Sequence, residues 1–476
     1  MTSTTSRPAI DLRIGAHRVF LHLLVNTLLV GVMNFTVWFA ITFWVYLETR
    51  SVLATGMVAG IFLVATALSG IWFGSLVDHY RKKRVMQGST LVSLALYLAS
   101  FLLYQLTPKE VFTDPASVRL WIFIVIAMVG VIAGNVRSIA LMTVVTVLIE
   151  EDRRDKANGL VGTATGVTFL ITSVISGVLV AAGDMFYVLL LAMAVLLVAA
   201  LHLGFVTVND RPYREGVEPE PAPAADISGV GKVDLRGTLR VVRGIPGLLA
   251  LIGFGCFNNF LGGAYMALMD AYGLSLISVQ AWGLLWGALS AGFILGGLAV
   301  ARTGLSKNPL RLLLLVNVVL WSVTILFPLR ASIIFLAIAM AIYMLLIPYA
   351  EASEQTLLQK VVPYERQGRV FGFAQSVEQA ASPLTAFLIG PLTQLIFIPF
   401  MTDGGGADAI GGWFGTGADR GIALVFVLTG VIGLVVTLLA LRSRFYRQLS
   451  EGYASAPEPV GAPTDVAEPA PTPDAR

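Results

Sequence analysis

Twelve stretches of the chain are long and apolar enough to cross a lipid bilayer. A helix rises about 1.5 Å per residue, so about 20 apolar residues cover the hydrocarbon core. Backbone polar groups in lipid must be satisfied within the segment, so each stretch is expected to be helical. The stretches are 20–47, 52–76, 85–106, 120–148, 160–182, 185–207, 246–273, 278–301, 310–329, 332–360, 371–400 and 421–442. The chain is therefore predicted to be an all-α membrane protein with twelve transmembrane helices.

Composition excludes several other classes of protein. Only 13% of the 476 residues are charged, whereas soluble chains carry about 25%. One cysteine, Cys256, and four scattered histidines make no recognisable metal-ligand cluster. The sequence has no phosphate-binding G-x-x-x-x-G-K-[ST] loop and no paired nucleophile and base in the spans. We therefore expect no enzyme activity, no cofactor and no metal, and the net charge of +3 gives no reason to expect a nucleic-acid partner.

The distribution of lysine and arginine predicts the orientation in the membrane. If the N-terminus is cytoplasmic, the inward segments hold 26 of the 32 basic residues and the outward segments hold five. Cytoplasmic loops of membrane proteins carry an excess of basic residues. Both termini are therefore predicted to be cytoplasmic.

Two pairs of segments indicate an internal repeat. The glycine pair at Gly70 and Gly74 recurs at Gly292 and Gly296, at an offset of 222. The turn IEEDRRDKANG, which ends at residue 159, aligns with VPYERQGRVFG, which ends at residue 372, at an offset of 213. A parallel repeat about an axis along the membrane normal produces such matches. The twelve helices are therefore predicted to form two pseudo-symmetric six-helix bundles.

Two segments differ from the membrane spans in composition. The linker between the sixth and seventh predicted spans contains the run PYREGVEPEPAPAAD, which is expected to be flexible. The later part of this linker, from Val233 to Arg243, is expected to form a short surface helix. The Pro/Ala-rich, acidic tail is expected to be disordered. The predicted organisation is 1–207 for the first bundle, 208–244 for the cytoplasmic linker, 245–445 for the second bundle and 446–476 for the disordered cytoplasmic tail.

Two motifs carry a resemblance to a known family. The segment GSLVDHYRKKR, residues 74–84, resembles the G-x-L-x-D-R-x-G-R-K signature of the major facilitator superfamily. The segment QKVVPYERQGRVFG, residues 359–372, resembles the turn before helix 11 in carriers of the macrolide-efflux and enterobactin-exporter type. His79 and Arg81 depart from the first signature. The fifth span has TSVISG, residues 172–177, where antiporters have a Gly-Pro pair.

The resemblance implies a secondary transporter. Such carriers export a bulky amphiphilic small molecule (a drug, a macrolide-like or a siderophore-like compound) by alternating access, usually in exchange for protons. It implies a prokaryotic plasma (inner) membrane, with a small-molecule substrate, protons and the lipid bilayer as partners, and we expect a monomer. Two alternatives remain open: a lipid or lysolipid translocator or uncoupled carrier, and a non-transporting membrane receptor.

The resemblance also implies a cytoplasmic gate. In the family, the residue matching Asp78 engages the start of a neighbouring helix, and the basic run locks the two halves together. The alternative is that the basic run only enforces the orientation. The expected gating residues are Gly74, Asp78, Arg81, Lys82, Lys83, Gly368 and Arg369.

Charged residues deep in the spans are candidates for coupling. A charge at the centre of a span costs about 2.5–3.5 kcal/mol to insert. Arg137 and Glu351 lie at matched depth in the fourth and tenth spans under the repeat. We hypothesise that they face each other across a central cavity, that they pair in one conformation and that they separate in another. The alternative is a static pair or snorkelling to the interface. Glu351, Glu354 and Glu378 are the candidate proton-coupling residues.

Asparagines give a second matched pair. Asn34 lies near the middle of the first span, and Asn258, followed by Asn259, lies near the middle of the seventh. An asparagine in lipid needs hydrogen-bond partners, so it faces protein or a cavity. Substrate binding and helix–helix bonding are equally supported for these residues. The candidate substrate-binding residues are Asn34, Arg137, Asn258, Asn259 and Glu351.

Overall fold

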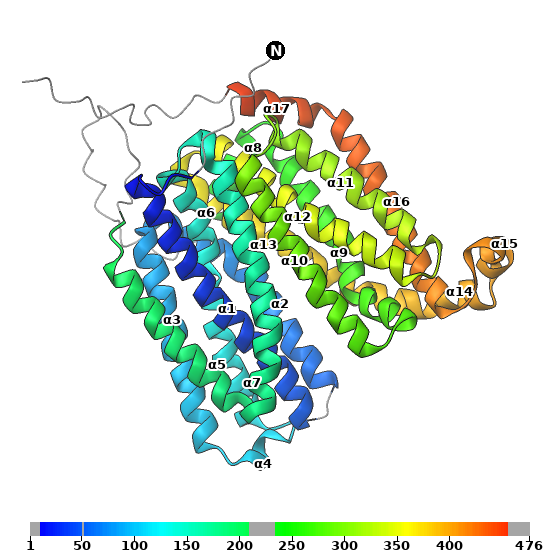
Figure 1. The fold of residues 1–476 in the computed structure, drawn as a ribbon, viewed down its shortest axis with the longest axis horizontal. Helices are drawn as coiled ribbons and strands as arrows, with labels where there is room; N and C mark the ends of the chain where they lie inside the picture. The colour runs from blue at the N-terminus through cyan, green and yellow to red at the C-terminus, as the bar shows by residue number, and fades with distance from the viewer. Residues whose placement is uncertain (1–9, 50–51, 209–233, 456–476) are drawn as a thin grey trace, which may run out of the picture.

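The computed structural model describes residues 10–49, 52–208 and 234–455. Within these ranges the protein is helical and has no strand, and eleven helices are long and apolar enough to span a membrane. Two groups of helices lie side by side, one built from the first half of the sequence and one from the second (Figure 1). The prediction of an all-α membrane protein is confirmed.

The N-terminal half contains α1 to α7. The fourth predicted span is divided at Asn135 into α5 and α6. The helices are α1 (Gly15–Thr49), α2 (Val52–His79), α3 (Lys82–Leu106), α4 (Lys109–Phe112), α5 (Val118–Gly134), α6 (Val136–Leu148) and α7 (Arg154–Phe205). The helix ends lie within a few residues of most predicted span boundaries.

The helix α7 is long enough to contain both the fifth and the sixth predicted spans. Asp184 within it has φ of 54°, a left-handed conformation that interrupts regular helical geometry. The first part of α7 runs away from the end where the N-terminus lies, and the second part returns toward it (Figure 1). Six predicted spans are therefore present in this half.

The C-terminal half repeats the pattern. The α8 helix confirms the short helix expected in the linker before the seventh span. The helices are α8 (Leu235–Gly244), α9 (Leu248–Leu276), α10 (Val279–Thr303), α11 (Pro309–Leu326), α12 (Ile333–Val361), α13 (Gln367–Leu392), α14 (Ile398–Thr402), α15 (Gly405–Phe414), α16 (Ala418–Arg442) and α17 (Arg444–Ser455).

Local sequence signals explain several helix starts. Ser278 accepts a hydrogen bond from the backbone of Ala281 at the start of α10. Asn308 does the same for Arg311 at the start of α11, where Pro309 occupies the first turn. Side-chain oxygens at these positions accept hydrogen bonds from N–H groups that have no partner within the helix. A proline in the first turn has no N–H group that needs a partner.

The prediction that disorder begins at residue 446 is wrong. The α17 helix continues to Ser455, and its Leu449 is buried. Asn308 donates a hydrogen bond to Ser450 at 2.6 Å, which fastens α17 to the start of α11. An apolar residue and a polar contact on one face hold this helix against the bundle, although its composition is polar. The residues 456–476 of the predicted tail lie outside the described residues.

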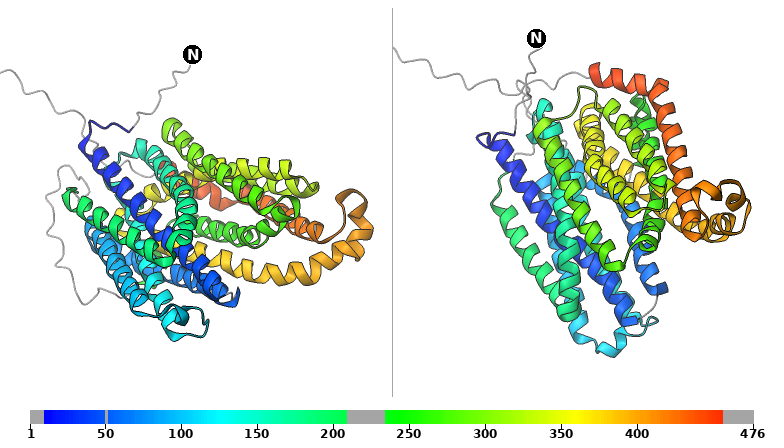
Figure 2. Two further views of the ribbon diagram at one scale, coloured as in Figure 1. Left: turned by 60° about the horizontal axis from the view of Figure 1, so that its bottom comes forward. Right: turned by 45° about the vertical axis from the view of Figure 1, so that its right-hand side comes forward.

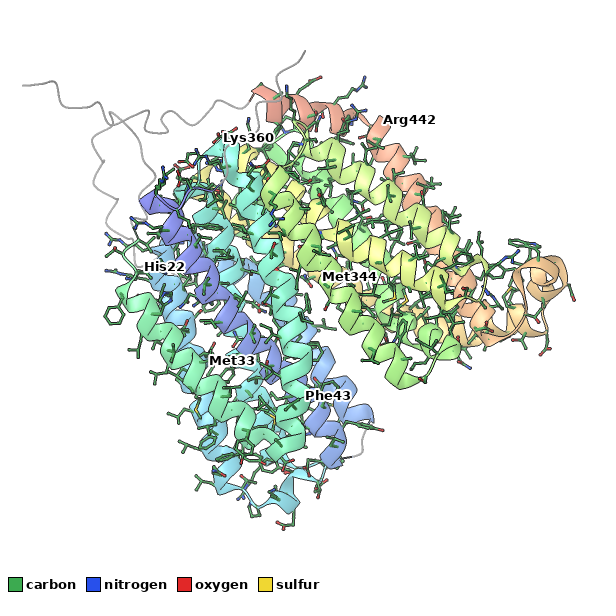
Figure 3. The ribbon with its side chains drawn as sticks, viewed as in Figure 1. His22, Met33, Phe43, Met344, Lys360 and Arg442 are labelled. Carbon is green, nitrogen blue, oxygen red and sulfur yellow. The ribbon has the colours of Figure 1, made fainter. Side chains whose placement is uncertain are left out.

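The two ends of the molecule differ. The described N-terminus, α8 and α17 lie at one end, which we call the linker end, and α4 lies at the far end (Figure 1). The α13 helix continues through α14 to α15 at the edge of the molecule (Figure 2). Lys360 and Arg442 lie toward the linker end, and Phe43 lies toward the far end (Figure 3).

Two helix pairs join the halves, and we call them the α2–α13 seam and the α7–α10 seam. In the first, a Cβ atom added at Gly74 would overlap the backbone of Gly368, and one at Gly372 would overlap the backbone of Gly70. In the second, a Cβ at Gly159 would overlap the backbone at Ala301. Small residues let helix backbones approach this closely. Glycines therefore mark the contacts between the halves in both seams, whereas the repeated glycines Gly292 and Gly296 meet α12 within the C-terminal half.

Candidate functional site

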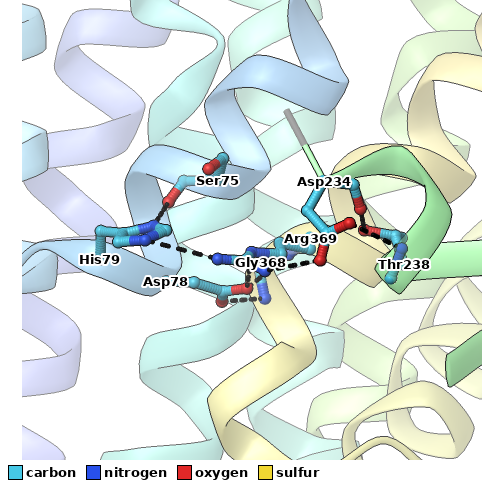
Figure 4. Close-up of polar contacts among 8 residues, drawn as sticks. Ser75, Asp78, His79, Asp234, Thr238, Gly368 and Arg369 are labelled. Atoms are coloured by element: carbon cyan, nitrogen blue, oxygen red, sulfur yellow. Dashed lines mark hydrogen bonds and ion pairs between the residues drawn. The ribbon is translucent and has the colours of Figure 1, made fainter. Parts of the chain in front are cut away.

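Asp78 joins the two halves at the linker end. Its carboxylate, at the end of α2, accepts hydrogen bonds from the backbone N–H groups of Gly368, at 2.7 Å, and Arg369, at 3.0 Å (Figure 4). These N–H groups belong to the first turn of α13, where backbone donors have no partner within the helix and a negative charge is favoured. The approach is possible because residue 368 has no side chain. We call this contact the Asp78 clasp.

Arg369 extends the Asp78 clasp to the linker. Its guanidinium lies 3.6 Å from the Asp78 carboxylate and 3.7 Å from that of Asp234. Asp234 also caps α8 by accepting from the backbone N–H of Gly237 at 2.8 Å. One arginine therefore contacts the end of α2 and the start of the linker helix (Figure 4).

The basic residues after α2 have different environments. Lys82 is buried, with its ammonium group 5.1 Å from the ring centre of Tyr364 in the other half. Lys83 donates to the carbonyl oxygen of Gly204 within its own half at 3.3 Å. Arg81 is exposed. Of these three predicted gating residues, Lys82 is the one that the structure places in contact with the C-terminal half.

Amide side chains form a further connection that the sequence analysis missed. Asn158 of α7 donates to Thr356 and to Gln359 of α12, both at 2.9 Å. Gln359 in turn donates to the carbonyl oxygen of Met142 at 3.0 Å. Asn158 lies in the first repeated turn and Gln359 just before the second, which is the signal that could have identified them.

An ion pair borders these amides. Lys360, which follows Gln359, lies 2.6 Å from the carboxylate of Glu151 in the other half. This pair, the amides and the Asp78 clasp all lie near the linker-end termini of their helices. The described structure is therefore a conformation in which the halves are joined at the linker end.

Three carboxyl groups gather in the C-terminal half. The carboxyl groups of Glu354 on α12 and Glu378 on α13 lie close enough to interact, and one oxygen of Glu378 is shielded from solvent and has no hydrogen-bond partner among the described residues. Glu351 lies one turn before Glu354 on the same helix and is exposed. A Cβ atom added at Gly255 of α9 would lie 2.6 Å from the Glu378 carboxylate oxygen, so the absence of a side chain there makes room for it.

Arg137 does not pair with Glu351 in the described conformation, and the pairing hypothesised for another conformation stays a prediction. Its side chain is 2% exposed and points into the N-terminal half. The guanidinium donates to the Met86 carbonyl oxygen at 2.8 Å, to the Thr90 hydroxyl at 2.6 Å, and to the Asn26 side-chain oxygen. Arg137 therefore points toward α1 and α3, where neutral oxygens accept hydrogen bonds from both of its terminal nitrogens.

The asparagines are engaged in packing between helices. Asn34 is 5% exposed and accepts from the Tyr97 hydroxyl at 2.7 Å. Asn258 accepts from the indole N–H of Trp321 at 3.2 Å, and the backbone carbonyl of Asn259 accepts from Ser382 at 2.8 Å. In this conformation Asn34 makes the helix–helix bonding that was one of the two roles considered for it, because its side chain is enclosed between α1, α3 and α5.

Aromatic side chains cross between the halves near the middle of the membrane spans. The ring of Phe169 on α7 lies 5.9 Å from that of Phe35 on α1 and 6.4 Å from that of Phe293 on α10. Phe169 is 46% exposed. Trp38, one turn after Phe35, stacks on Phe62 of α2 at 4.9 Å. These residues form an apolar aromatic surface that the sequence analysis did not single out.

The comparisons with known proteins agree with this architecture. The sequence profile of the Major Facilitator Superfamily matches residues 23–386. Macrolide efflux protein A of Streptococcus pyogenes is 21% identical over 365 residues, which cover 73% of this chain and 83% of that protein.

Solved structures show the same fold. The crystal structure of the human organic anion transporter MFSD10 has a TM-score of 0.64 and 12% identity, and the match covers 88% of this chain and 99% of that one. The crystal structure of a bacterial homologue of the iron transporter ferroportin in its outward-facing state has a TM-score of 0.62 and 14% identity, with coverage of 90% and 100%. Because the profile covers most of the sequence and the fold agrees, this chain belongs to the Major Facilitator Superfamily and is a multi-pass membrane transporter.

Proposed function

We propose that this transporter exports a bulky amphiphilic small molecule across a prokaryotic plasma membrane in exchange for protons. The contact between Glu354 and Glu378 carries the proposal. The macrolide efflux relative, although distant, supports export as the direction.

The distribution of charge supports a cytoplasmic linker end. The exposed arginines of α8 and α17 lie there, together with the basic run after α2. Basic residues concentrate on the cytoplasmic side of membrane proteins. With this orientation both termini are cytoplasmic, and the described conformation is closed to the cytoplasm and faces outward.

The carboxyl pair provides a site for one proton. A carboxylate only accepts hydrogen bonds, so a bond between two carboxyl groups requires that one of them is protonated. Two adjacent negative charges in a span would repel each other strongly, and a shared proton removes one of them. The Glu354–Glu378 pair is therefore a proton-loaded state in our proposal.

The conformation in which the proton is bound fits an exporter. An exporter that exchanges substrate for protons takes up a proton while facing outward and returns inward loaded. Opening at the cytoplasmic end would bring water to the carboxyl groups, which favours their charged form and release of the proton. Glu351, exposed one turn away, is then available to a basic or hydrogen-bonding group of the substrate.

Apolar surface is available for the rest of the substrate. A shallow, open apolar groove lies along one face of α2 beyond the Gly70 contact with α13. It is lined by Met57, Gly60, Ile61, Val64, Ala65 and Leu68. With the aromatic surface around Phe169, this region suits the apolar part of an amphiphile.

Transport by purified protein in proteoliposomes tests the proposal. Uptake of a macrolide, a cationic dye and a siderophore would be measured with and without an imposed proton gradient. We expect gradient-dependent accumulation of at least one compound that a protonophore abolishes. Glu378→Gln and Glu354→Gln should remove the dependence on the gradient, whereas Glu451→Gln, which changes an exposed carboxylate on α17, should retain it. Accumulation by Glu378→Gln with the full gradient dependence would overturn the assignment of the coupling site.

A lipid or lysolipid translocator is the second candidate. The open apolar surface of α2 favours it, because a lipid tail could enter from the side of the bilayer. This function predicts movement of a fluorescent lysolipid between leaflets that does not depend on the proton gradient. Binding of any of these ligands without flux would instead favour a receptor.

A further inference from the structure

Asp155 contacts the other half of the protein across the α7–α10 seam. It lies in the first turn of α7 and is 2% exposed. One carboxylate oxygen accepts a hydrogen bond from the backbone N–H of Leu305, which follows α10, at 2.7 Å. The other accepts from the backbone N–H of Lys156 at 2.8 Å. The carboxylate therefore holds both the start of its own helix and the segment after α10.

The backbone of the C-terminal half is shaped for this contact. Gly304 has φ of +71°, and a Cβ atom there would lie 2.7 Å from the Asp155 carboxylate oxygen. A residue with a side chain would be strained in this conformation and would push against the carboxylate. The glycine thus permits the chain to turn at the end of α10 and present the Leu305 N–H.

The repeat relates the two seams to each other. At the offset of 213, Gly159 corresponds to Gly372, and both glycines pack against the backbone of the opposite helix. At the offset of 222, Gly74 corresponds to Gly296, which packs against Leu345 of α12, and its neighbour Gly297 is the glycine that meets α7 at Thr163. Corresponding helices therefore join the halves twice, once as α2 with α13 and once as α10 with α7, although α7 meets α10 nearer its end, at Val300 and Ala301.

The carboxylate, however, comes from different helices of the pair in the two seams. The residue that corresponds to Asp78 at the end of α10 is Val300, which cannot accept a hydrogen bond through its side chain. The residue that corresponds to Gly368 at the start of α7 is Asp155. In the first seam α2 supplies the acceptor, and in the second seam the partner helix α7 supplies it.

We propose that Asp155 is a second gating residue, which holds the α7–α10 seam closed as Asp78 holds the α2–α13 seam. Both carboxylates belong to the N-terminal half, and both bind backbone N–H groups of the C-terminal half. Closure at the linker end therefore requires both contacts to form, and opening breaks both. The proposal rests on transport by alternating access but not on the substrate or on protons.

Spin-label distances in the full-length protein test this proposal. Cys256→Ser removes the one native cysteine. Asp152→Cys and Lys307→Cys, both at exposed positions on opposite sides of the α7–α10 seam, provide the labels. The ratio of long to short distances then reports the open and closed populations without substrate or a proton gradient.

We expect Asp155→Ala to raise the ratio of open to closed protein by about tenfold or more, because a hydrogen bond to a charged group is lost at the seam. Asp78→Ala should give a shift of similar size with the same labels. Asp155→Asn, which keeps an acceptor oxygen, should give a smaller shift. Gly304→Ala, at the end of α10, should also raise the ratio of open to closed protein, because its methyl group would displace the Asp155 carboxylate.

A role limited to stabilising α7 predicts a different result. Asp419 is an acidic residue in the first turn of α16, so Asp419→Ala controls for the loss of a charge at a helix start. If Asp155→Ala and Gly304→Ala lower the melting temperature but leave the distance distribution unchanged, as expected for Asp419→Ala, the gating role is wrong. If Asp155→Ala does not fold, the distributions of Asp155→Asn and Gly304→Ala decide: unchanged distributions in both overturn the proposal.

Discussion

Gly74 on α2 lies directly against the backbone of Gly368 on α13, so closely that a Cβ atom at position 74 would overlap the Gly368 carbonyl oxygen. The same glycine, residue 368, donates its N–H to Asp78. Steric fit and hydrogen bonding therefore act on the same turn of α13. The closed linker end depends on both, because the carboxylate reaches the helix start only when the backbones touch.

Gly74→Ala should prevent full closure at the linker end. The added methyl group meets backbone atoms, which cannot move aside as a flexible side chain can. We expect the open population to rise at least tenfold, equivalent to about 1.4 kcal/mol, with loss of transport and retention of the helical fold. Accessibility of a cysteine introduced at Tyr80, which is exposed beside the seam, would measure this in a Cys256→Ser background.

Gly60→Ala is the matched control for this prediction. It makes the same change on the same helix, but a Cβ at position 60 would meet nothing within 4 Å. It should leave the open population unchanged. Equal labelling rates in Gly74→Ala and wild-type protein would contradict the role assigned to the glycine contact.

Gly255→Ala should weaken proton coupling without removing any carboxyl group. Its Cβ atom would lie 2.6 Å from the Glu378 carboxylate oxygen, so the Glu378 side chain must leave the position in which it meets Glu354. Separating the two carboxyl groups removes the shared proton site. We expect substrate accumulation in proteoliposomes to depend less on the proton gradient than in wild-type protein, by about tenfold at a fixed gradient if the pair loses about 1.4 kcal/mol.

Gly253→Ala serves as the control on the same helix, because its Cβ would meet nothing within 4 Å. Both changes replace glycine in a helix interior, which by itself stabilises a helix by up to about 1 kcal/mol. A loss of gradient dependence in both variants would show that the effect comes from helix stiffness and not from Glu378.

Arg137→Met should destabilise the protein while leaving its dependence on the proton gradient intact. The arginine satisfies oxygens of Asn26, Met86 and Thr90 inside the N-terminal half. Leaving such buried groups without a partner costs about 1–3 kcal/mol each. The melting temperature in detergent should fall by several degrees, and transport per folded molecule should keep its gradient dependence.

Arg311→Met provides the comparison, since Arg311 is exposed at the start of α11 and its loss should change neither property. If Arg137→Met kept the wild-type melting temperature but transported independently of the proton gradient, Arg137 would have to be assigned to coupling after all. That outcome would favour the cavity-facing role inferred from the sequence.

The sequence by itself determined the membrane spans, because hydrophobic length and the need to satisfy backbone groups in lipid are local properties of each segment. It also identified Asp78 and the glycines of the α2–α13 seam through the two motifs, and the repeat through their offsets. Depth in the membrane followed from residue counting, and for this reason Arg137 and Glu351 were placed at matched depth.

The tertiary structure decided which way each side chain points. Residue counting does not give the rotation of a helix about its axis, and a rotation of half a turn moves a side chain from a cavity into the packing between helices. Arg137 and Asn34 therefore lie inside the N-terminal half, whereas Glu354 and Glu378, on different helices, come into contact. Asp155 became visible only when α7 and α10 were seen together, because its partner is a backbone N–H 150 residues away, and a backbone donor has no signature in the sequence.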